Sequence, residues 1–310
     1  MPRYLDPKND LTFKKIFGEH ENLCISLLNN MLPLEEGREI VQISYHPNEL
    51  TPRIDALRNS IVDVRCTDTF GRQFIVEMQM YWTESFKSRV LLNASKVYIK
   101  QLKVSGEFKL LQPVYSLNFV NEIFEKSPEM TDSYYHHYQI VNIAHTEKRI
   151  EGLEFVFIEL PKFKAKNHAE RKLHELWLRF LTEIREDTGT VPEDLIREED
   201  IREAVQLLEE SGYTKEELDA YDKYIDIICT EISVKNDAER EGLKKGMEKG
   251  IEKGIEKGIE KERSIQEKLR EEERRRTVLN AHCEGLSNEI IAKIAGFSIV
   301  EIEKIIAENR

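Results

Sequence analysis

Two acidic residues on neighbouring strands of a predicted β-hairpin are the strongest candidates for chemistry in this sequence. Asp63 lies near the start of the stretch 61–80, and Glu77 lies near its end. If Asp68 and Arg72 flank the turn, paired residue numbers sum to 140, so Asp63 lies directly opposite Glu77. Cross-strand neighbours have β-carbons roughly 4.5–5.5 Å apart, where like charges repel. Such a pair indicates a divalent cation, because Mg²⁺ prefers carboxylate oxygens.

The pattern of the same stretch predicts the hairpin that would position these acids. Along each arm, apolar residues alternate with mostly polar ones, as in strands with one buried face. The apolar face comprises Val62, Val64, Cys66, Phe74, Val76, Met78 and Met80. Thr69-Phe70-Gly71 is the predicted loop, with its glycine in the left-handed conformation. The solvated side of an antiparallel sheet is also polar, so the pattern alone leaves that interpretation open.

Asp63, followed by Glu77-Met78-Gln79 on the next strand, resembles the metal-binding motif of the PD-(D/E)XK nuclease superfamily. Gln79 stands where that motif has a lysine. With the upstream stretch 10–18 and with Arg89 and Tyr98 downstream, the sequence is similar to the Rpn family of recombination-promoting nucleases, also described as transposases. The resemblance covers most of the chain, including its repetitive tail.

The resemblance implies a metal-dependent DNA endonuclease that hydrolyses phosphodiester bonds in recombination or transposition. Asp63 and Glu77 would bind Mg²⁺, or Mn²⁺ in its place, and no small-molecule cofactor is expected. Gln79 is expected to orient the water or a metal ligand, because an amide cannot act as a cation, and Asp10 is an auxiliary acidic candidate. Two alternatives stay open: a nucleic-acid-binding protein that has lost catalysis, and an oligomeric scaffold.

Basic residues near these acids are candidates for contacts with the DNA backbone. The candidates are Lys14, Lys15, Arg65, Arg89 and Lys96. The first two lie in a predicted short helix at residues 10–17, which Asp10 would cap and Gly18 would end. The last two lie on a predicted amphipathic helix at residues 84–104, which the resemblance places behind the metal site. A solvated outer helix face explains the same charges, so both interpretations stay open.

The order of predicted elements gives an α/β fold, a restriction-endonuclease-like αβββαβ core with a C-terminal all-helical extension. Helices at 10–17 and 22–31 precede a strand at 40–46, the hairpin and the helix at 84–104. Further strands are expected at residues 113–120, 134–145 and 153–160. This is the element order that the resemblance implies for the nuclease core.

Four segments are expected along the chain. They are a nuclease core at 1–165, a helical block packed on it at 166–235, a charged repeat helix at 236–276 and a small helical hairpin at 277–310. Within the repeat, glycines recur every four residues from Gly242 to Gly258. The repeat predicts either a semi-rigid spacer or a contact between helices of a homo-oligomer. The final hairpin, with Ser298 and Glu301 as a capping box, is expected to serve assembly, with DNA readout as the alternative.

Composition sets broader limits on the fold and function. The chain has 310 residues, of which 40% are hydrophobic and 34% are charged, so it can bury one sizeable core and still carry long solvated helices. A net charge of −12 argues against a broad basic surface for nucleic acid, although bound metal and a local basic strip can supply positive charge. The four scattered cysteines are expected to be reduced core thiols. We expect a cytoplasmic protein without membrane association, since no signal region or membrane-length apolar run is evident.

Overall fold

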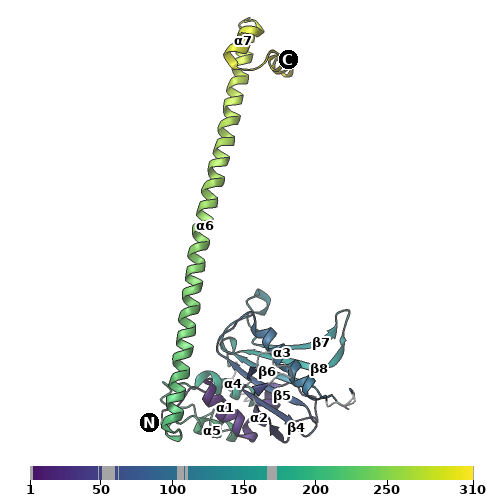
Figure 1. The fold of residues 1–310 in the computed structure, drawn as a ribbon, viewed down its shortest axis with the longest axis vertical. Coiled ribbons are helices and arrows are strands. Elements are labelled where there is room, and N and C mark those ends of the chain that lie inside the picture. The colour runs from purple at the N-terminus through teal and green to yellow at the C-terminus, as the bar shows by residue number, and fades with distance from the viewer. Residues whose placement is uncertain are drawn as a thin grey trace. The chain divides into compact units, whose positions relative to one another are not determined.

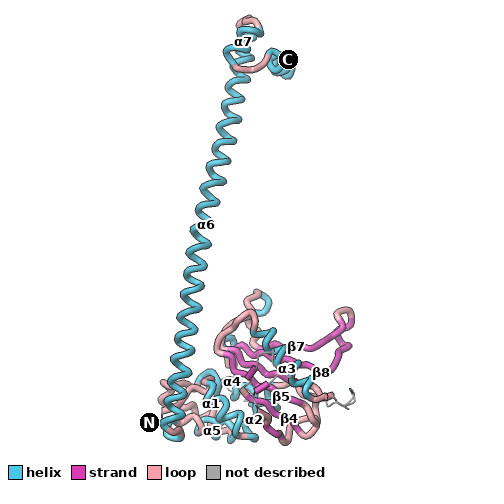
Figure 2. Tube along the Cα trace, in the orientation of Figure 1, coloured by secondary structure: helices cyan, strands magenta, loops and turns pink. Residues whose placement is uncertain are grey.

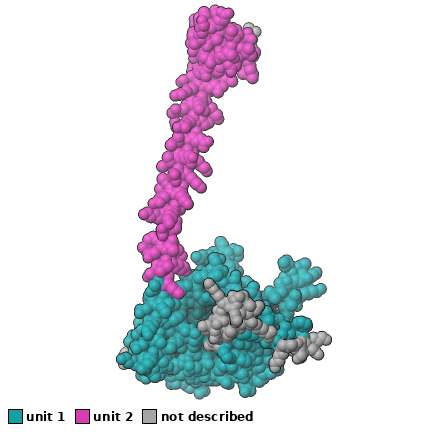
Figure 3. All heavy atoms as spheres, in the orientation of Figure 1, with its two compact units in different colours: residues 1–230 teal, residues 231–310 magenta. Residues whose placement is uncertain are grey.

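The computed structural model describes residues 3–47, 49–50, 60–61, 63–102, 108, 111–165 and 173–309. The chain forms two compact units, residues 1–230 and residues 231–310 (Figure 3). The first unit is built around a six-stranded sheet, and the second is built from helices (Figure 2). Among the described helices, none is long and apolar enough to cross a membrane.

The sheet has the strand order β1-β4-β5-β6-β8-β7. Its strands are β1 (Ile43–Tyr45), β4 (Val64–Asp68), β5 (Gln73–Gln79), β6 (Val114–Val120), β7 (Tyr135–Asn142) and β8 (His145–Glu159). β1 and β5 each run antiparallel to β4, while β5, β6 and β8 are parallel and β7 is antiparallel to β8. With α1 (Asp10–Glu19) first and α3 (Phe86–Lys100) between β5 and β6, the predicted αβββαβ core is confirmed. A short pair, β2 (Glu49–Leu50) and β3 (Ser60–Ile61), is inserted before β4.

The hairpin formed by β4 and β5 has the predicted register, since Val64 pairs with Val76. Gly71 has a φ of 82°, the left-handed conformation that the predicted loop requires. Val62, the first residue of the predicted apolar face, lies outside the described residues, as does the predicted end of the helix at 103–104. Turn geometry and alternation therefore set which residues of β4 and β5 share a face.

Helices cover both faces of the sheet (Figure 1). The apolar face of the hairpin packs into the main core with α1, α2 (Glu21–Met31), α4 (Leu173–Glu183) and α5 (Glu199–Gln206). On the other face, Ile75 packs against Ala94 and Val97 of α3. The polar face of β5 is therefore covered, and Glu77 is buried rather than solvated. This burial removes the interpretation of the polar pattern as an open sheet surface.

The start of α1 differs from the prediction in a way that affects the acids. The N-cap is Asn9, whose Oδ1 atom accepts from the amide of Leu11 at 2.9 Å, so the predicted cap at Asp10 is wrong. An amide oxygen at this position satisfies a helix-end N–H as well as a carboxylate does. Asp10 instead begins the helix with its carboxylate available to side chains. Gly18 lies inside the helix and does not end it.

A buried carboxylate at the end of β8 fixes the loop that follows β6. Glu159 is fully buried, and its Oε1 atom accepts hydrogen bonds from the amides of Phe124 and Glu125 at 2.6 and 3.0 Å. Its Oε2 atom lies 2.9 Å from Nε2 of His136 and 2.6 Å from Nζ of Lys162. Two strands and a loop are thus joined through one charged group.

The predicted helical segments after the core form one very long helix. α6 runs without interruption over 69 residues, Lys215–Cys283, where separate segments meeting at residues 235 and 236 were expected. The described part of this stretch contains glycines but no proline, and glycine weakens a helix without removing a hydrogen-bond donor. The predicted start of the helical block at residue 166 lies outside the described residues.

The second unit ends in the expected helical hairpin, α7 (Asn288–Ala295) and α8 (Ile299–Glu308). Ser298 and Glu301 form the predicted capping box, with Ser298 Oγ accepting from the amide of Glu301. Cys24 and Cys66 are buried thiols, as predicted, but Cys229 and Cys283 are exposed on α6, so the core assignment is wrong for these two. The core clusters that include residues of α6 contain neither of these cysteines.

The repeat glycines give a testable distinction between spacer and contact. A Cβ atom added at Gly246, Gly250 or Gly254 would meet nothing within 4 Å. Replacing all three by Ala is therefore expected to stabilise the helix by about 1 kcal/mol per site. Circular dichroism should show higher helicity and a higher melting temperature, with no change in mass by sedimentation. Dissociation of an oligomer in the variant would instead show that these glycines line a contact between copies.

Candidate active site

Asp63 lies at the bend that leads into β4, one residue before the strand begins. Its Oδ2 atom accepts a hydrogen bond from the backbone amide of Met78 on β5 at 2.6 Å. This bond holds the carboxylate against β5, where Glu77 precedes Met78. The Asp63 side chain is 19% exposed, so its carboxylate is accessible from solvent.

The protonation of Asp63 reflects its surroundings. Burial raises its pKa to about 7, and the nearby charges of Asp10 and Glu77 act in the same direction. The Met78 amide and the Lys14 ammonium oppose the shift. The negative charges of Asp10 and Glu77 therefore repel that of Asp63 when no metal ion is bound.

Glu77 lies deeper on β5, facing α3. Its Oε1 atom accepts a hydrogen bond from Nδ2 of Asn93 at 3.0 Å. Burial raises the pKa of Glu77, while the Asn93 hydrogen bond and the charge of Arg89 lower it. Because Arg89 and Asn93 are four residues apart, they lie on one face of α3 and meet β5 together.

α1 brings a third carboxylate and a cation to the same place. Nζ of Lys14 lies 2.6 Å from Oδ1 of Asp10 and 3.9 Å from Oδ1 of Asp63. Lys14 was predicted to contact DNA, and the structure places it between these two acids. The start of α1, the start of β4 and the end of β5 therefore converge.

Gln79 and Arg89 form a pair beside the acids. The guanidinium of Arg89 donates a hydrogen bond to Oε1 of Gln79, while Nε2 of Gln79 donates to the carbonyl of Tyr81 at 2.6 Å. The side-chain amide of Gln79 is therefore fixed with its oxygen toward the Arg89 guanidinium. Arg89 also lies 4.9 Å from the ring centroid of Phe86, which packs its other side.

The remaining predicted basic residues lie elsewhere. Nζ of Lys15 contacts Oε1 of Glu217 on α6 at 3.0 Å and lies 3.8 Å from the ring centroid of Tyr213. Arg65 points from β4 toward Gln73 and lies two residues along the chain from Asp63. Lys96 is partly exposed on α3. The structure thus brings together Asp10, Lys14, Asp63, Glu77, Gln79 and Arg89, and it places Lys15 and Arg65 outside this cluster.

The donor set suits a hard divalent cation that keeps part of its water shell. Across the described residues, no group of three or more His, Cys, Asp or Glu side chains converges as a complete metal cage. Mg²⁺ usually takes one or two carboxylates and completes its shell with water and substrate phosphate. Asp63 and Glu77 supply that number, and their mutual repulsion would fall once a cation lay between them.

Asn93 is the residue at this site that the sequence analysis did not single out. It is buried, and its Oδ1 atom has no hydrogen-bond partner while Nδ2 is bonded to Glu77. The available signal was a polar residue on the apolar stripe of a helix, between Val90 and Val97. A polar side chain at a core-facing position needs a partner across the interface, and the strand face opposite carries Glu77.

The raised pKa of Asp63 makes a prediction about stability. An unfolded Asp has a pKa of about 3.9, so between pH 4 and 7 the folded protein holds a proton that the unfolded chain has lost. Stability without metal should therefore fall as the pH rises through this window. Asp63→Asn is expected to stabilise the protein by on the order of 1–3 kcal/mol at pH 8 and to have little effect near pH 4.

Thermal unfolding in EDTA at both pH values measures this effect. Asp226→Asn on the exposed surface of α6 serves as the control and should leave the melting temperature unchanged at either pH. Equal or lower stability of Asp63→Asn at pH 8 would mean that the Asp63 carboxylate is not under electrostatic strain.

The mixed sheet, its covering helices and the order of its elements are those of a PD-(D/E)XK nuclease fold. The model of the PD-(D/E)XK nuclease family transposases matches residues 7–238, and the chain belongs to this family. No curated protein and no solved structure matches the chain. Membership supports a nuclease or transposase role with DNA as substrate, and nucleases of this superfamily generally use divalent metal ions.

Proposed function

We propose that this protein is a metal-dependent DNA endonuclease that acts in recombination or transposition, with Asp63 and Glu77 as the metal-binding acids. The observation that carries the proposal is the pair itself. A β-hairpin and the Met78 amide hold two repelling carboxylates together on a covered sheet face, at the cost of a raised pKa for each. Perturbed acids of this kind concentrate at functional sites.

The chain orients both acids before any ligand binds. The Met78 amide fixes Asp63, and Asn93 fixes Glu77, so a hydrogen bond orients each carboxylate. Bound Mg²⁺ or Mn²⁺ would supply Lewis-acid polarisation of the phosphate and a water of lowered pKa. Lys14 balances the charge of Asp10 and Asp63 and lies where it can also attract the DNA strand.

Arg89 accounts for the missing lysine of the motif. Gln79 is neutral, but its carbonyl oxygen holds the Arg89 guanidinium at that position. We infer that Arg89 supplies the positive charge beside the phosphate. Because a guanidinium stays protonated, its contribution would be electrostatic stabilisation rather than proton transfer.

Nicking of supercoiled plasmid by the full-length protein tests the function. Cleavage is expected with Mg²⁺ or Mn²⁺ and is expected to stop in EDTA. Arg89→Lys should retain more activity than Arg89→Gln, since it keeps the charge. Activity that persists in EDTA, or equal activity of the two Arg89 variants, would contradict the respective proposals.

One observation favours a second candidate, a DNA-binding protein without catalysis. Gln79 cannot act as a general base or a cation, which is the role the motif gives to lysine. In that case, the wild-type protein would retard plasmid DNA in a gel yet leave it supercoiled with either metal ion. Cleavage that depends on Asp63 excludes this candidate.

A further inference from the structure

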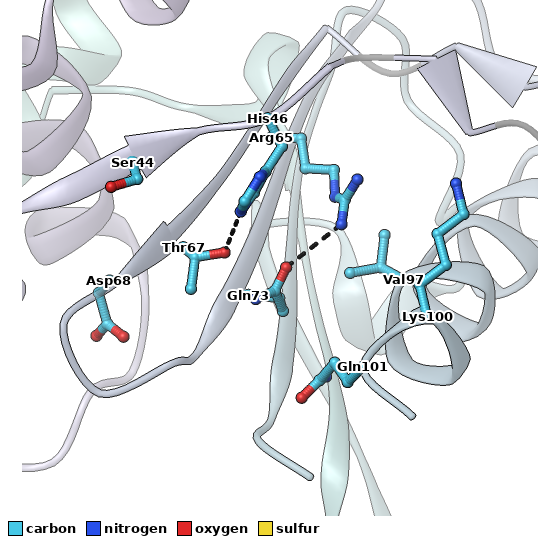
Figure 4. A pocket seen from close by; sticks show the side chains of 9 residues that line it. All are labelled: Ser44, His46, Arg65, Thr67, Asp68, Gln73, Val97, Lys100 and Gln101. Atoms are coloured by element: carbon cyan, nitrogen blue, oxygen red, sulfur yellow. Dashed lines mark hydrogen bonds between the residues drawn. The ribbon is translucent and has the colours of Figure 1, made fainter. Parts of the chain in front are cut away.

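A second polar pocket lies on the same sheet face as the acids, beside the end of α3 (Figure 4). Its volume is about 380 Å³. The polar groups that line it come from β1, β4, β5 and α3 and from the residues next to them: Ser44, His46, Arg65, Thr67, Asp68, Gln73, Lys100 and Gln101. None of these residues belongs to the cluster around Asp63 and Glu77.

Arg65 is the central cation of this pocket. Its side chain extends from β4 toward α3, and among the described residues it donates one long hydrogen bond, of 3.5 Å, to Oε1 of Gln73 (Figure 4). Its Nε atom is buried without a hydrogen-bond partner. Within the described part of the chain, no carboxylate lies within 4 Å of its guanidinium. A half-buried guanidinium without a counter-ion destabilises the fold, and a bound anion would offset this cost.

The described lining includes a second cation and one acid that is already paired. Lys100 reaches it from the last turn of α3 (Figure 4). Among the described lining residues, Asp68 alone carries a carboxylate, and a buried ion pair of 2.7 Å with Arg72 neutralises it. Nε2 of His46 lies 2.5 Å from Oγ1 of Thr67, so this imidazole is positioned for hydrogen bonding.

The pocket lies close to the acids along β4. Asp63 and Arg65 are two residues apart, so they project from the same face of the sheet, roughly 7 Å apart along it. Successive phosphates advance by about 3.4 Å along the axis of one DNA strand. A strand with one phosphate at Asp63 can therefore place another, a few nucleotides away, at Arg65.

We propose that the Arg65 pocket binds an internal backbone phosphate of the DNA strand that is cleaved, a few nucleotides away, at Asp63 and Glu77. This inference rests on the proposed nuclease function and adds a second anchor for the same strand. The pocket favours phosphate because the buried Nε donor of Arg65 belongs to a cation and the Asp68 carboxylate is paired. It carries no base-specific contact, so it positions the strand without reading sequence.

Fluorescence anisotropy of full-length protein with an internally labelled duplex that has 5′-hydroxyl ends tests this. Binding is measured in EDTA between about 50 and 200 mM KCl, so that cleavage does not interfere. Arg65→Gln is expected to weaken binding roughly tenfold and to reduce the slope of log K against log salt by about one. Arg65→Lys should recover part of the slope, and a thermal melt checks that both variants fold.

Arg149→Gln is the matched control, because Arg149 lines another pocket in which Glu151 and Glu154 accompany it. It should leave the slope unchanged. An unchanged slope for Arg65→Gln would overturn the proposal, as would an effect that appears only with 5′-phosphorylated ends. Failure of the nuclease function is separate, since it would show as Arg65-dependent binding without cleavage in Mg²⁺.

Discussion

Replacing Asp63 by Asn is expected to reduce the rate of DNA cleavage by on the order of 10³-fold while the protein stays folded. The amide keeps the size of the side chain and can still accept the Met78 hydrogen bond, but it removes the charge that would hold the cation. Glu77→Gln should have an effect of similar size, because both carboxylates would bind the same ion. Initial rates of plasmid nicking at saturating Mg²⁺ measure the loss.

A second measurement separates metal binding from structure. Mg²⁺ is expected to raise the melting temperature of the wild-type protein, because a ligand that binds only the folded state stabilises it. Asp63→Asn should lose this increase, and Asp226→Asn should keep both the increase and full activity. Near-normal cleavage by Asp63→Asn would remove Asp63 from the site, whatever the effect of Glu77→Gln.

The largest effect on stability is expected at Glu159. Glu159→Ala should lower the free energy of unfolding by about 3–5 kcal/mol, because it leaves the buried Lys162 ammonium without its counter-charge. The amides of Phe124 and Glu125 would lose their acceptor as well. Urea unfolding at pH 7 measures the loss.

The pH dependence of this effect follows from the pKa of Glu159. Burial alone would raise it, but Lys162, the Phe124 and Glu125 amides and His136 outweigh burial and lower it. A lowered carboxyl pKa stabilises the fold above the unfolded value of about 4.3, and this stability is lost as the pH falls through the folded pKa. The difference in the free energy of unfolding between wild type and Glu159→Ala should therefore become smaller below pH 4.

Glu129→Ala, at an exposed position in the loop that the cluster fixes, provides the control and should change stability by less than about 0.5 kcal/mol. A loss below about 1 kcal/mol for Glu159→Ala would show that the cluster does not hold β8 and the loop together.

Local patterns were sufficient to predict the hairpin and the position of the acids within it. Alternation and a glycine turn set the register of β4 and β5, and register decides which side chains share a face. The same stretch could not reveal that α3 covers the polar face, since a helix and its strand partner are far apart in sequence. Asn93, which bonds to Glu77, was missed for that reason.

Other differences arose where two residues compete for one role. Asn9 and Asp10 are both good caps, and sequence alone does not decide which one takes the position. The expected boundary at residues 235 and 236 marks the change to the charged glycine repeat, but α6 continues through it, because each glycine costs only about 1 kcal/mol and none breaks the helix. The place of Lys14 between Asp10 and Asp63 depends on packing of α1 against β4, which no local pattern encodes.

The pair of Arg89 and Gln79 shows how the structure changes the interpretation of a motif. The sequence records the loss of a lysine at residue 79, which counts against catalysis. The structure puts a guanidinium from α3 at the same amide. A positive charge can thus be present at the site without its usual residue.

Anomalous diffraction from crystals of the full-length protein soaked in Mn²⁺ tests the central claim most directly. We predict an anomalous peak between the carboxylates of Asp63 and Glu77 that disappears in Asp63→Asn crystals. Mn²⁺ bound elsewhere, or absent from the two acids under conditions in which the protein cleaves DNA, would contradict the assignment of these acids as the metal site.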